Sequence, residues 1–129
     1  MLGQSLMKVK DLMHVKSKIP LINHKNAMRE ALIKMTSYGF GCVGITDLKN
    51  NLIGIITDGD LRRNISKNFI DMPINKIMTK TPITIEPNQN IKNAIKIMND
   101  NKITALFVLN KKSKSPLGII HIHDCIKSK

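Results

Sequence analysis

Apolar residues recur at helical spacing in two parts of the chain. Two sets of four share the i, i+3, i+4, i+7 spacing of a single helix face: Met28, Ala31, Leu32 and Met35 in the first half, and Ile91, Ala94, Ile95 and Met98 in the second. Such a stripe is typical of an amphipathic helix with one face in a core. Asn90 stands just before the second stripe and fits an N-cap behind Pro87. The pattern predicts two core-packed helices in which methionine fills space.

Short apolar runs bounded by polar turns predict strands on both sides of each helix. They lie at 19–22, 42–45 and 52–56 in the first half, and at 82–85, 105–109 and 117–120 in the second. Polar turns at 47–51 and 110–116 separate the last two strands of each half, and a short helix follows the last strand. Each half therefore predicts the order strand, helix, strand, strand, helix, an α/β (α+β) fold.

The two halves are also similar in sequence. Three segments recur in the same order: Val9-Lys-Asp-Leu-Met13 as Ile74-Asn-Lys-Ile-Met78, residues 28–35 as 91–98, and residues 52–60 as 117–124. This predicts an internal duplication, with repeats at 9–67 and 74–129 and a connection at 68–73. Because about 60 residues bury only a modest core, we expect the two repeats to pack face to face around a pseudo-twofold axis.

Charge is the next feature that bears on function. Lysine and arginine number 21 against 9 acidic residues, and the formal net charge is +12. A basic chain can attract the phosphates of nucleic acids. The lysines are spread along the whole chain, however, and aromatic residues for base stacking make up only 3%. General basicity is therefore the favoured interpretation, and association with RNA or DNA stays as the weaker alternative.

Nothing in the sequence predicts a membrane partner. The apolar runs fall far short of the roughly 20 residues that span a bilayer. The first residues have neither the charged leader nor the apolar stretch of a signal peptide. We therefore expect a cytoplasmic protein. Cys42 and Cys125 stand alone, without metal-binding spacing, and are expected to be buried thiols.

The strand that ends near Thr57 carries the first candidate chemistry. Gly54 lets a bound ligand approach the backbone closely. The hydroxyl of Thr57 and the N–H groups that open the following helix suit a phosphate. Asp60 can accept two hydrogen bonds from the paired hydroxyls of a ribose, and Arg62 and Arg63 add positive charge beside the helix start. Two other interpretations of the Asp58-Gly-Asp60 triplet stay open, a metal motif and a simple helix cap.

The corresponding segment of the second half runs from Gly118 to Asp124 and contains two histidines. His121 and His123 alternate, so along a strand both side chains would face one side. A metal site would need further ligands, so we place these histidines at the rim of a ligand pocket, where protonation could make phosphate binding pH-dependent. His14 is expected to be an ordinary surface residue.

Catalysis by the chain itself has little support. No paired carboxylates flank a candidate nucleophile, and the sequence contains neither a Ser/His/Asp signature nor a Walker-type glycine loop. No cofactor is required by any motif. The chain is therefore not expected to be an enzyme.

The duplication and its two motifs resemble the CBS (cystathionine β-synthase) domain pair, or Bateman module, over residues 9–126. The ligand motif of that family is Gly, two apolar residues, Ser/Thr, any residue, Ser/Thr, Asp. The resemblance implies a ribose role for Asp60 and Asp124 and a phosphate role for Thr57. The sequence departs from the motif because Gly59 and His123 occupy its second hydroxyl position, and His121 replaces the first hydroxyl of the second repeat. Ten residues are expected to contact a ligand between the repeats: Ile22, Thr57, Asp58, Asp60, Arg62, Thr81, Ile83, His121, His123 and Asp124.

A narrower resemblance concerns four strings, Asp11-Leu-Met-His14, Thr57-Asp-Gly-Asp-Leu-Arg-Arg63, Ile77-Met-Thr79 and Ile120-His-Ile-His-Asp124. Together they are similar to the C-terminal CBS pair of arabinose-5-phosphate isomerases. Similar strings occur in CBS pairs attached to sugar nucleotidyltransferases, which stays as an alternative. The isomerase resemblance implies that residues 1–8 are the remnant of a linker from a missing sugar-isomerase domain. The parent enzyme would interconvert ribulose 5-phosphate and arabinose 5-phosphate for synthesis of the lipopolysaccharide sugar Kdo.

The resemblance also implies an effector and an assembly. The effector would be an adenine nucleotide or a CMP-sugar, and binding would bias the catalytic domains of the parent enzyme. Pairs of this kind are expected to associate as homodimers. A ligand-free scaffold that only holds subunits together is the rival interpretation, and the incomplete motif in both repeats is its main support.

Overall fold

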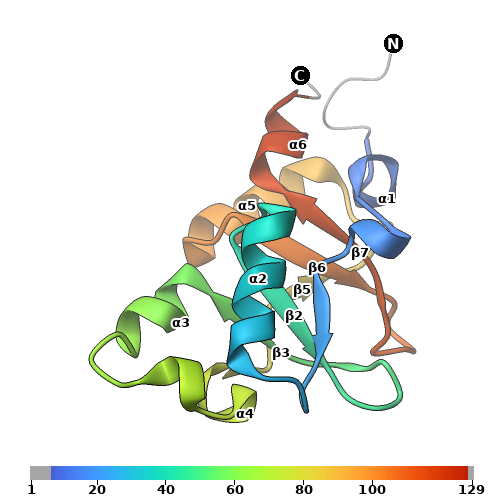
Figure 1. The fold of residues 1–129 in the computed structure, drawn as a ribbon. Coiled ribbons are helices and arrows are strands. Elements are labelled where there is room, and N and C mark those ends of the chain that lie inside the picture. The colour runs from blue at the N-terminus through green and yellow to red at the C-terminus, as the bar shows by residue number, and fades with distance from the viewer. Residues whose placement is uncertain (1–6, 128–129) are drawn as a thin grey trace. The chain divides into compact units, whose positions relative to one another are not determined.

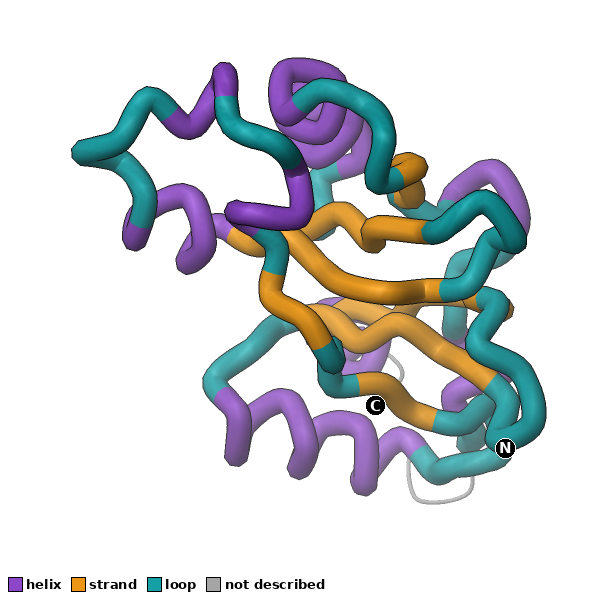
Figure 2. Tube along the Cα trace, turned by 90° about the horizontal axis from the view of Figure 1, so that it is seen from below, coloured by secondary structure: helices purple, strands orange, loops and turns teal. Residues whose placement is uncertain are grey.

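The structure is a computed structural model that describes residues 7–127, and these residues form two compact units (Figure 1). The first unit comprises residues 20–82. The second unit comprises residues 83–127 together with residues 7–19, which come from the start of the chain. Each unit has its own mixed sheet, its own helices and its own apolar core, and the helices and strands of both can be followed along the tube in Figure 2.

The sheet of the first unit has four strands in the order β1-β2-β3-β4. Their bounds are β1 Leu21–Asn23, β2 Cys42–Thr46, β3 Leu52–Thr57 and β4 Thr79–Lys80. β1 runs parallel to β2, whereas β3 is antiparallel to both of its neighbours. The helices of this unit are α2 Met28–Tyr38, α3 Asp58–Arg63, the 3-10 helix η3 Phe69–Asp71 and α4 Ile74–Ile77.

The sheet of the second unit has three strands in the order β5-β6-β7. Their bounds are β5 Thr84–Ile85, β6 Ala105–Leu109 and β7 Pro116–His121. Again the first pair is parallel and the second antiparallel. The helices of this unit are α1 Val9–Leu12, the 3-10 helix η2 Lys16–Lys18, α5 Ile91–Asn101 and α6 Ile122–Lys127. The predicted order strand, helix, strand, strand, helix is thus confirmed in both units.

The helix termini follow from local chemistry. The side chain of Asn90 accepts a hydrogen bond from the backbone N–H of Asn93 at 2.7 Å, which confirms the predicted N-cap of α5. At the same position of α2 stands Ala27, which has no side chain able to cap. α2 ends at Gly39, whose φ of 75° is the left-handed conformation that glycine adopts readily.

Each repeat begins with a short segment that does not pack on its own sheet. It packs on the sheet of the other repeat. α4 and β4 follow the first repeat in sequence, yet β4 forms the edge of the sheet that holds β1 to β3. At the start of the chain, His14 pairs with Ile119 of β7, and the backbone N–H of Val9 donates to the carbonyl of Gln89 at 2.8 Å. The boundaries of the compact units therefore differ from those of the sequence repeats. The first unit covers residues 20–82, whereas the first repeat covers residues 9–67. Periodicity could not predict α1 and α4, because each has only four residues.

Both cores are aliphatic, as the composition predicts. Met28, Met35 and Met98 from the two predicted stripes are buried in them, which confirms their role in packing. Cys42 and Cys125 are buried as expected. Among the described residues, no helix has the length and apolar character needed to cross a membrane.

Candidate functional site

The first candidate site is the junction where β3 passes into α3. Thr57 is the N-cap of α3, and its hydroxyl oxygen accepts a hydrogen bond from the backbone N–H of Asp60 at 3.3 Å. In return, a carboxylate oxygen of Asp60 accepts from the backbone N–H of Thr57 at 2.9 Å. This reciprocal arrangement is a capping box, with aspartate in place of the usual glutamate. Asp60 therefore takes part in capping α3, as one interpretation of the Asp58-Gly-Asp60 triplet predicts, and its expected contact with a ribose stays a prediction.

The carboxylate of Asp60 has further partners. Its Oδ2 accepts from the Thr57 hydroxyl at 3.2 Å, and its Oδ1 accepts from the Thr79 hydroxyl at 2.7 Å. Arg63 donates to the same Oδ1 at 2.5 Å and forms an ion pair with it. Asp60 is only 3% exposed, so its charge is buried and stabilised by these donors. The junction is thus tied to β4, the strand that the following sequence repeat supplies.

The other polar residues of the first junction lie at the surface. Asp58 and Arg62 are exposed. A side chain at Gly59 would begin 3.2 Å from an Nη atom of Arg63 and 3.8 Å from an Nη atom of Arg62. Two guanidinium groups therefore lie over the position where the family motif has its second hydroxyl. The positive charge predicted beside the helix start is present.

The second candidate site is the junction where β7 passes directly into α6 (Figure 1). Here Asp124 takes the place of Asp60, and its Oδ2 accepts from the backbone N–H of His121 at 2.9 Å. The Nε2 atom of His14 lies 3.0 Å from Oδ2 and 3.1 Å from Oδ1 of the same carboxylate. The two sites thus use an aspartate at the same position to hold a strand end and a segment from the start of the adjacent repeat.

The prediction that His14 is an ordinary surface residue is wrong. Its ring faces Asp124, and the two side chains are only 32% and 22% exposed. His14 corresponds to Thr79 in the aligned repeats, and Thr79 makes the equivalent contact with Asp60. Neither residue belonged to the predicted set. Extending the repeat match by one residue, from Met13 and Met78 to His14 and Thr79, would have marked them as equivalent positions, but not as partners of the two aspartates.

The expectation that His121 and His123 share one face of a strand is also wrong. β7 ends at His121, and His123 lies in the first turn of α6. The two rings nevertheless meet edge to face with 4.8 Å between centroids, and the backbone N–H of His123 donates to Nδ1 of His121 at 3.1 Å. Burial, and to a smaller extent the neighbouring His123, lowers the pKa of His121. The neutral form of His121 is therefore favoured.

The glycines of the two motifs make close contacts where a side chain would begin. A side chain at Gly54 would meet the sulfur of Met78 at 2.6 Å, and one at Gly118 would meet the sulfur of Met13 at 2.7 Å. The absence of a side chain at each glycine leaves room for a methionine, Met78 at Gly54 and Met13 at Gly118. Close packing is therefore a physical reason for glycine there, and the approach of a ligand to the backbone of Gly54 stays a prediction.

The remaining predicted residues lie apart from these carboxylates. Ile22 is 8% exposed and belongs to the apolar core of the first unit. Thr81 is exposed, has a positive φ of 53° and hydrogen-bonds the carbonyl of Lys80. Ile83 is 43% exposed, so its side chain is available to a ligand. Their expected ligand contacts stay predictions.

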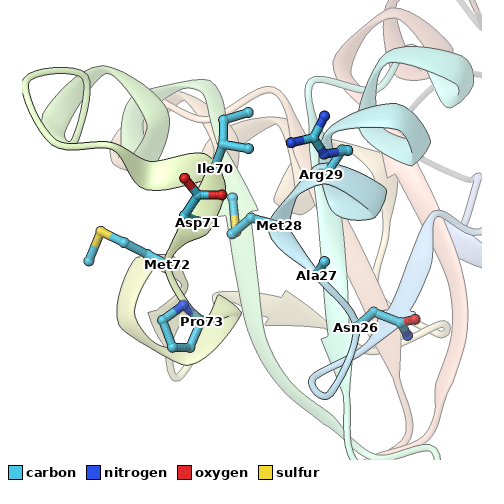
Figure 3. A pocket seen from close by; sticks show the side chains of 8 residues that line it. All are labelled: Asn26, Ala27, Met28, Arg29, Ile70, Asp71, Met72 and Pro73. Carbon is cyan, nitrogen blue, oxygen red and sulfur yellow. The ribbon is translucent and has the colours of Figure 1, made fainter.

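A shallow pocket of about 370 Å³ lies elsewhere in the first unit, between the start of α2 and the segment around η3 (Figure 3). Side chains of α2 face those of the η3 segment across it, and Asp71 and Arg29 supply charges of opposite sign. Its lining consists of Asn26, Ala27, Met28, Arg29, Ile70, Asp71, Met72 and Pro73. None of the ten predicted ligand residues lines it.

Metal and thiol chemistry find no support in the described part of the chain. No group of three His, Cys, Asp or Glu side chains there is placed to hold a metal ion. Burial raises the pKa of Cys42 to about 12, with the charge of Asp58 as a smaller cause. Burial likewise raises the pKa of Cys125 to about 11. Both thiols are therefore protonated at neutral pH and poor nucleophiles.

The comparison with protein families gives two matches to the CBS domain, over residues 9–67 and 74–129. Among curated proteins, the chain is 38% identical over 125 residues to the uncharacterized protein RP505 of Rickettsia prowazekii. The match covers 97% of this chain and 39% of that protein. It is 36% identical over 125 residues to the arabinose 5-phosphate isomerase KdsD of Pseudomonas aeruginosa, covering 95% of this chain and 38% of the isomerase. The chain thus spans less than two-fifths of these relatives.

Solved structures share the fold. The CBS domain pair of protein MJ0100, in complex with 5′-methylthioadenosine and S-adenosyl-L-methionine, has a TM-score of 0.79 at 24% identity and covers 94% of each chain. CBSX2 in complex with AMP has a TM-score of 0.78 at 20% identity, again over 94% of each chain. At these identities the similarity shows the fold alone.

Proposed function

Because the chain belongs to the CBS domain family, as a tandem pair of such domains, we propose that it is a nucleotide-binding regulatory module with no catalytic role of its own. The observation that carries this proposal is the repeated strand-to-helix junction. In both units an aspartate at the same position of the motif lies at the start of a short helix, hydrogen-bonded to the end of the preceding strand. A carboxylate held in this way can accept the paired hydroxyls of a ribose wherever its remaining acceptor positions are not taken by other donors.

An adenine nucleotide is the effector class that the comparisons support best. MJ0100 was solved with adenosine-containing ligands and CBSX2 with AMP, and both share the fold of this chain. A CMP-sugar is the second effector class, because it offers the same ribose and phosphate groups.

The parent protein in this proposal is a sugar-phosphate isomerase that interconverts ribulose 5-phosphate and arabinose 5-phosphate. Support comes from the 36% identity to KdsD of Pseudomonas aeruginosa, which extends over 95% of this chain. Because the match covers 38% of KdsD, the catalytic part would lie in sequence beyond this chain. Both the isomerase and its nucleotide effector would act in the cytoplasm, and the pair would associate with a second copy as a homodimer.

Calorimetry and thermal unfolding test the effector proposal directly. The purified chain is titrated with AMP, ADP, ATP, S-adenosylmethionine and a CMP-sugar, and its melting temperature is recorded with each. A true effector at 100 times its dissociation constant should stabilise the fold by about 2.7 kcal/mol. Inorganic phosphate at equal concentration serves as the control for ionic effects on this basic protein. Absence of saturable binding by every nucleotide would refute the proposal.

The scaffold interpretation is the alternative that one observation favours. Four protein donors occupy the two carboxylate oxygens of Asp60, which leaves little acceptor capacity for a ligand at the first junction. A scaffold would bind none of the nucleotides and would form a stable dimer by light scattering. A sensor would bind at least one of them, whatever its oligomeric state.

A further inference from the structure

We infer that the pair has a single ribose-accepting carboxylate, Asp124, and that Asp60 serves only to hold the first unit together. This inference rests on the proposed nucleotide binding and adds which of the two junctions is used. It reverses the order that the sequence motif suggests, since the first junction has the better match to the family pattern.

The hydrogen bonds of Asp60 fill its carboxylate. An ionised carboxylate has about four acceptor positions. Oδ2 takes the backbone N–H and the hydroxyl of Thr57, and Oδ1 takes Arg63 and the hydroxyl of Thr79. A ribose diol could enter only by displacing two of these donors. Displacing Thr79 would also loosen β4 from the junction.

The hydrogen bonds of Asp124 leave its carboxylate incomplete. Within the described residues, Oδ2 takes the backbone N–H of His121, and one donor, the Nε2 atom of His14, is shared between the two oxygens at 3.0 and 3.1 Å. A shared donor directs one proton at two acceptors, so each interaction is weaker than a single well-aligned bond. A ribose diol could therefore bind Oδ1 while His14 moves onto Oδ2 alone.

Exposure and charge point the same way. The Asp124 side chain is 22% exposed, whereas that of Asp60 is 4% exposed. The guanidinium of Arg63, which stays protonated at any physiological pH, forms an ion pair with Asp60. The group facing Asp124 is a histidine, whose charge is not permanent. A polar ligand therefore finds an accessible acceptor at the second junction and a satisfied one at the first.

The test compares the affinities of AMP and 2′,3′-dideoxy-AMP, which differ only in the ribose hydroxyls. The wild-type chain should prefer AMP by about tenfold to a hundredfold, the loss expected when hydrogen bonds to a charged group are removed. Asp124→Asn should reduce this preference to near unity. Asp60→Asn should keep the preference while lowering the melting temperature more than Asp124→Asn does.

Each result has a distinct meaning. A hydroxyl preference that survives Asp124→Asn and disappears in a folded Asp60→Asn variant would overturn the inference and leave nucleotide binding intact. The same holds if the wild-type chain binds AMP without any hydroxyl preference. No binding of AMP by the wild-type chain would overturn both proposals. Should Asp60→Asn fail to fold, Thr79→Val removes one donor of that carboxylate and should likewise leave the hydroxyl preference unchanged.

His14 supplies an independent check on the same site. If a ribose hydroxyl takes over part of its contact with Asp124, then His14→Ala should bind AMP as tightly as the wild type or up to about tenfold more tightly. The gain should be absent for 2′,3′-dideoxy-AMP. A tenfold loss of AMP affinity would show instead that His14 is needed to position the carboxylate. It would contradict the idea that a ribose hydroxyl replaces His14 on Asp124.

Discussion

The two strand-to-helix junctions place an aspartate at the same position and surround it with different chemistry. Asp60 is buried among threonine hydroxyls and a permanently charged arginine. Asp124 is partly exposed and faces His14, with His121 and His123 beside it. The acceptor positions of the first aspartate are all taken by protein donors, whereas the second aspartate has spare acceptor capacity and histidine neighbours. Duplication has preserved the backbone role of the aspartate and left its surroundings free to change.

The contrast also shows what the aspartates do before any ligand binds. Each one joins three parts of its unit: the end of a strand, the start of a helix, and a segment brought in from the start of the adjacent repeat. A ligand that binds one of these carboxylates would therefore act on the attachment of that segment. In the proposed regulation, ligand binding would therefore change how firmly this segment is held to its unit.

The largest expected effect is the loss of the buried carboxylate. Asp60→Ala should lower the free energy of unfolding by about 3 kcal/mol, because it removes the helix cap and leaves buried donors without an acceptor. Asp124→Ala should cost about half as much, since its site is open to water. Urea unfolding measures both values, and the exposed Asp58→Ala serves as control, with an expected change within about 0.5 kcal/mol. Equal losses at the two aspartates would contradict the contrast between the junctions.

The motif glycines sharpen the comparison at a second position. A methyl group at Gly118 would lie 2.8 Å from the backbone oxygen of His14, whereas one at Gly54 would meet mainly the flexible side chain of Met78. Backbone cannot move aside as a methionine can, so Gly118→Ala should cost about 2 kcal/mol and Gly54→Ala about 1 kcal/mol. The melting temperatures of the two variants give the order. A smaller loss for Gly118→Ala would show that the segment at His14 yields easily.

The helix caps provide a gain rather than a loss. Ala27 has φ −78° and ψ 151°, nearly the same as the −78° and 161° of Asn90, the capping residue of α5. Ala27→Asn should therefore stabilise the first unit by about 0.5–1 kcal/mol, while Asn90→Ala should destabilise the second by about 1 kcal/mol. Thermal unfolding of both variants checks the sign of each change. A loss of stability in Ala27→Asn would mean that its side chain cannot reach the backbone N–H groups of α2.

The smallest effect is the pH dependence of the second unit. Burial lowers the pKa of His121 in the folded state below its usual 6.5, so the folded chain binds this proton less tightly than the unfolded chain. The stability contributed by neutral His121 is present above about pH 6.5 and is lost as the pH falls through the folded value. His121→Thr, which copies Thr57, should therefore lose less stability than the wild type between about pH 7.5 and pH 5. Parallel pH profiles for the two proteins would show that His121 makes no difference.

Much of this fold could be predicted from local pattern. The stripes at 28–35 and 91–98 indicated both long helices because eleven residues contain three full turns of helical spacing. The internal match of motifs indicated the duplication and located both aspartates. His14 and Thr79 escaped prediction because their contacts with Asp124 and Asp60 join different segments, 110 and 19 residues apart, and leave no periodic trace. The methionines that pack against Gly54 and Gly118 were not predicted either, since both come from other segments of the chain.

The sequence by itself determined the repeated order of strands and helices, the aliphatic composition of the cores and the position of an aspartate at the start of each short helix. These properties depend on residues close together in the chain, where spacing and side-chain chemistry decide the outcome. Only the tertiary structure decided which segment completes each sheet, what fills the space above each motif glycine, and which carboxylate keeps an acceptor to spare. Those depend on contacts between distant segments, whose energies are set by packing and burial rather than by local order.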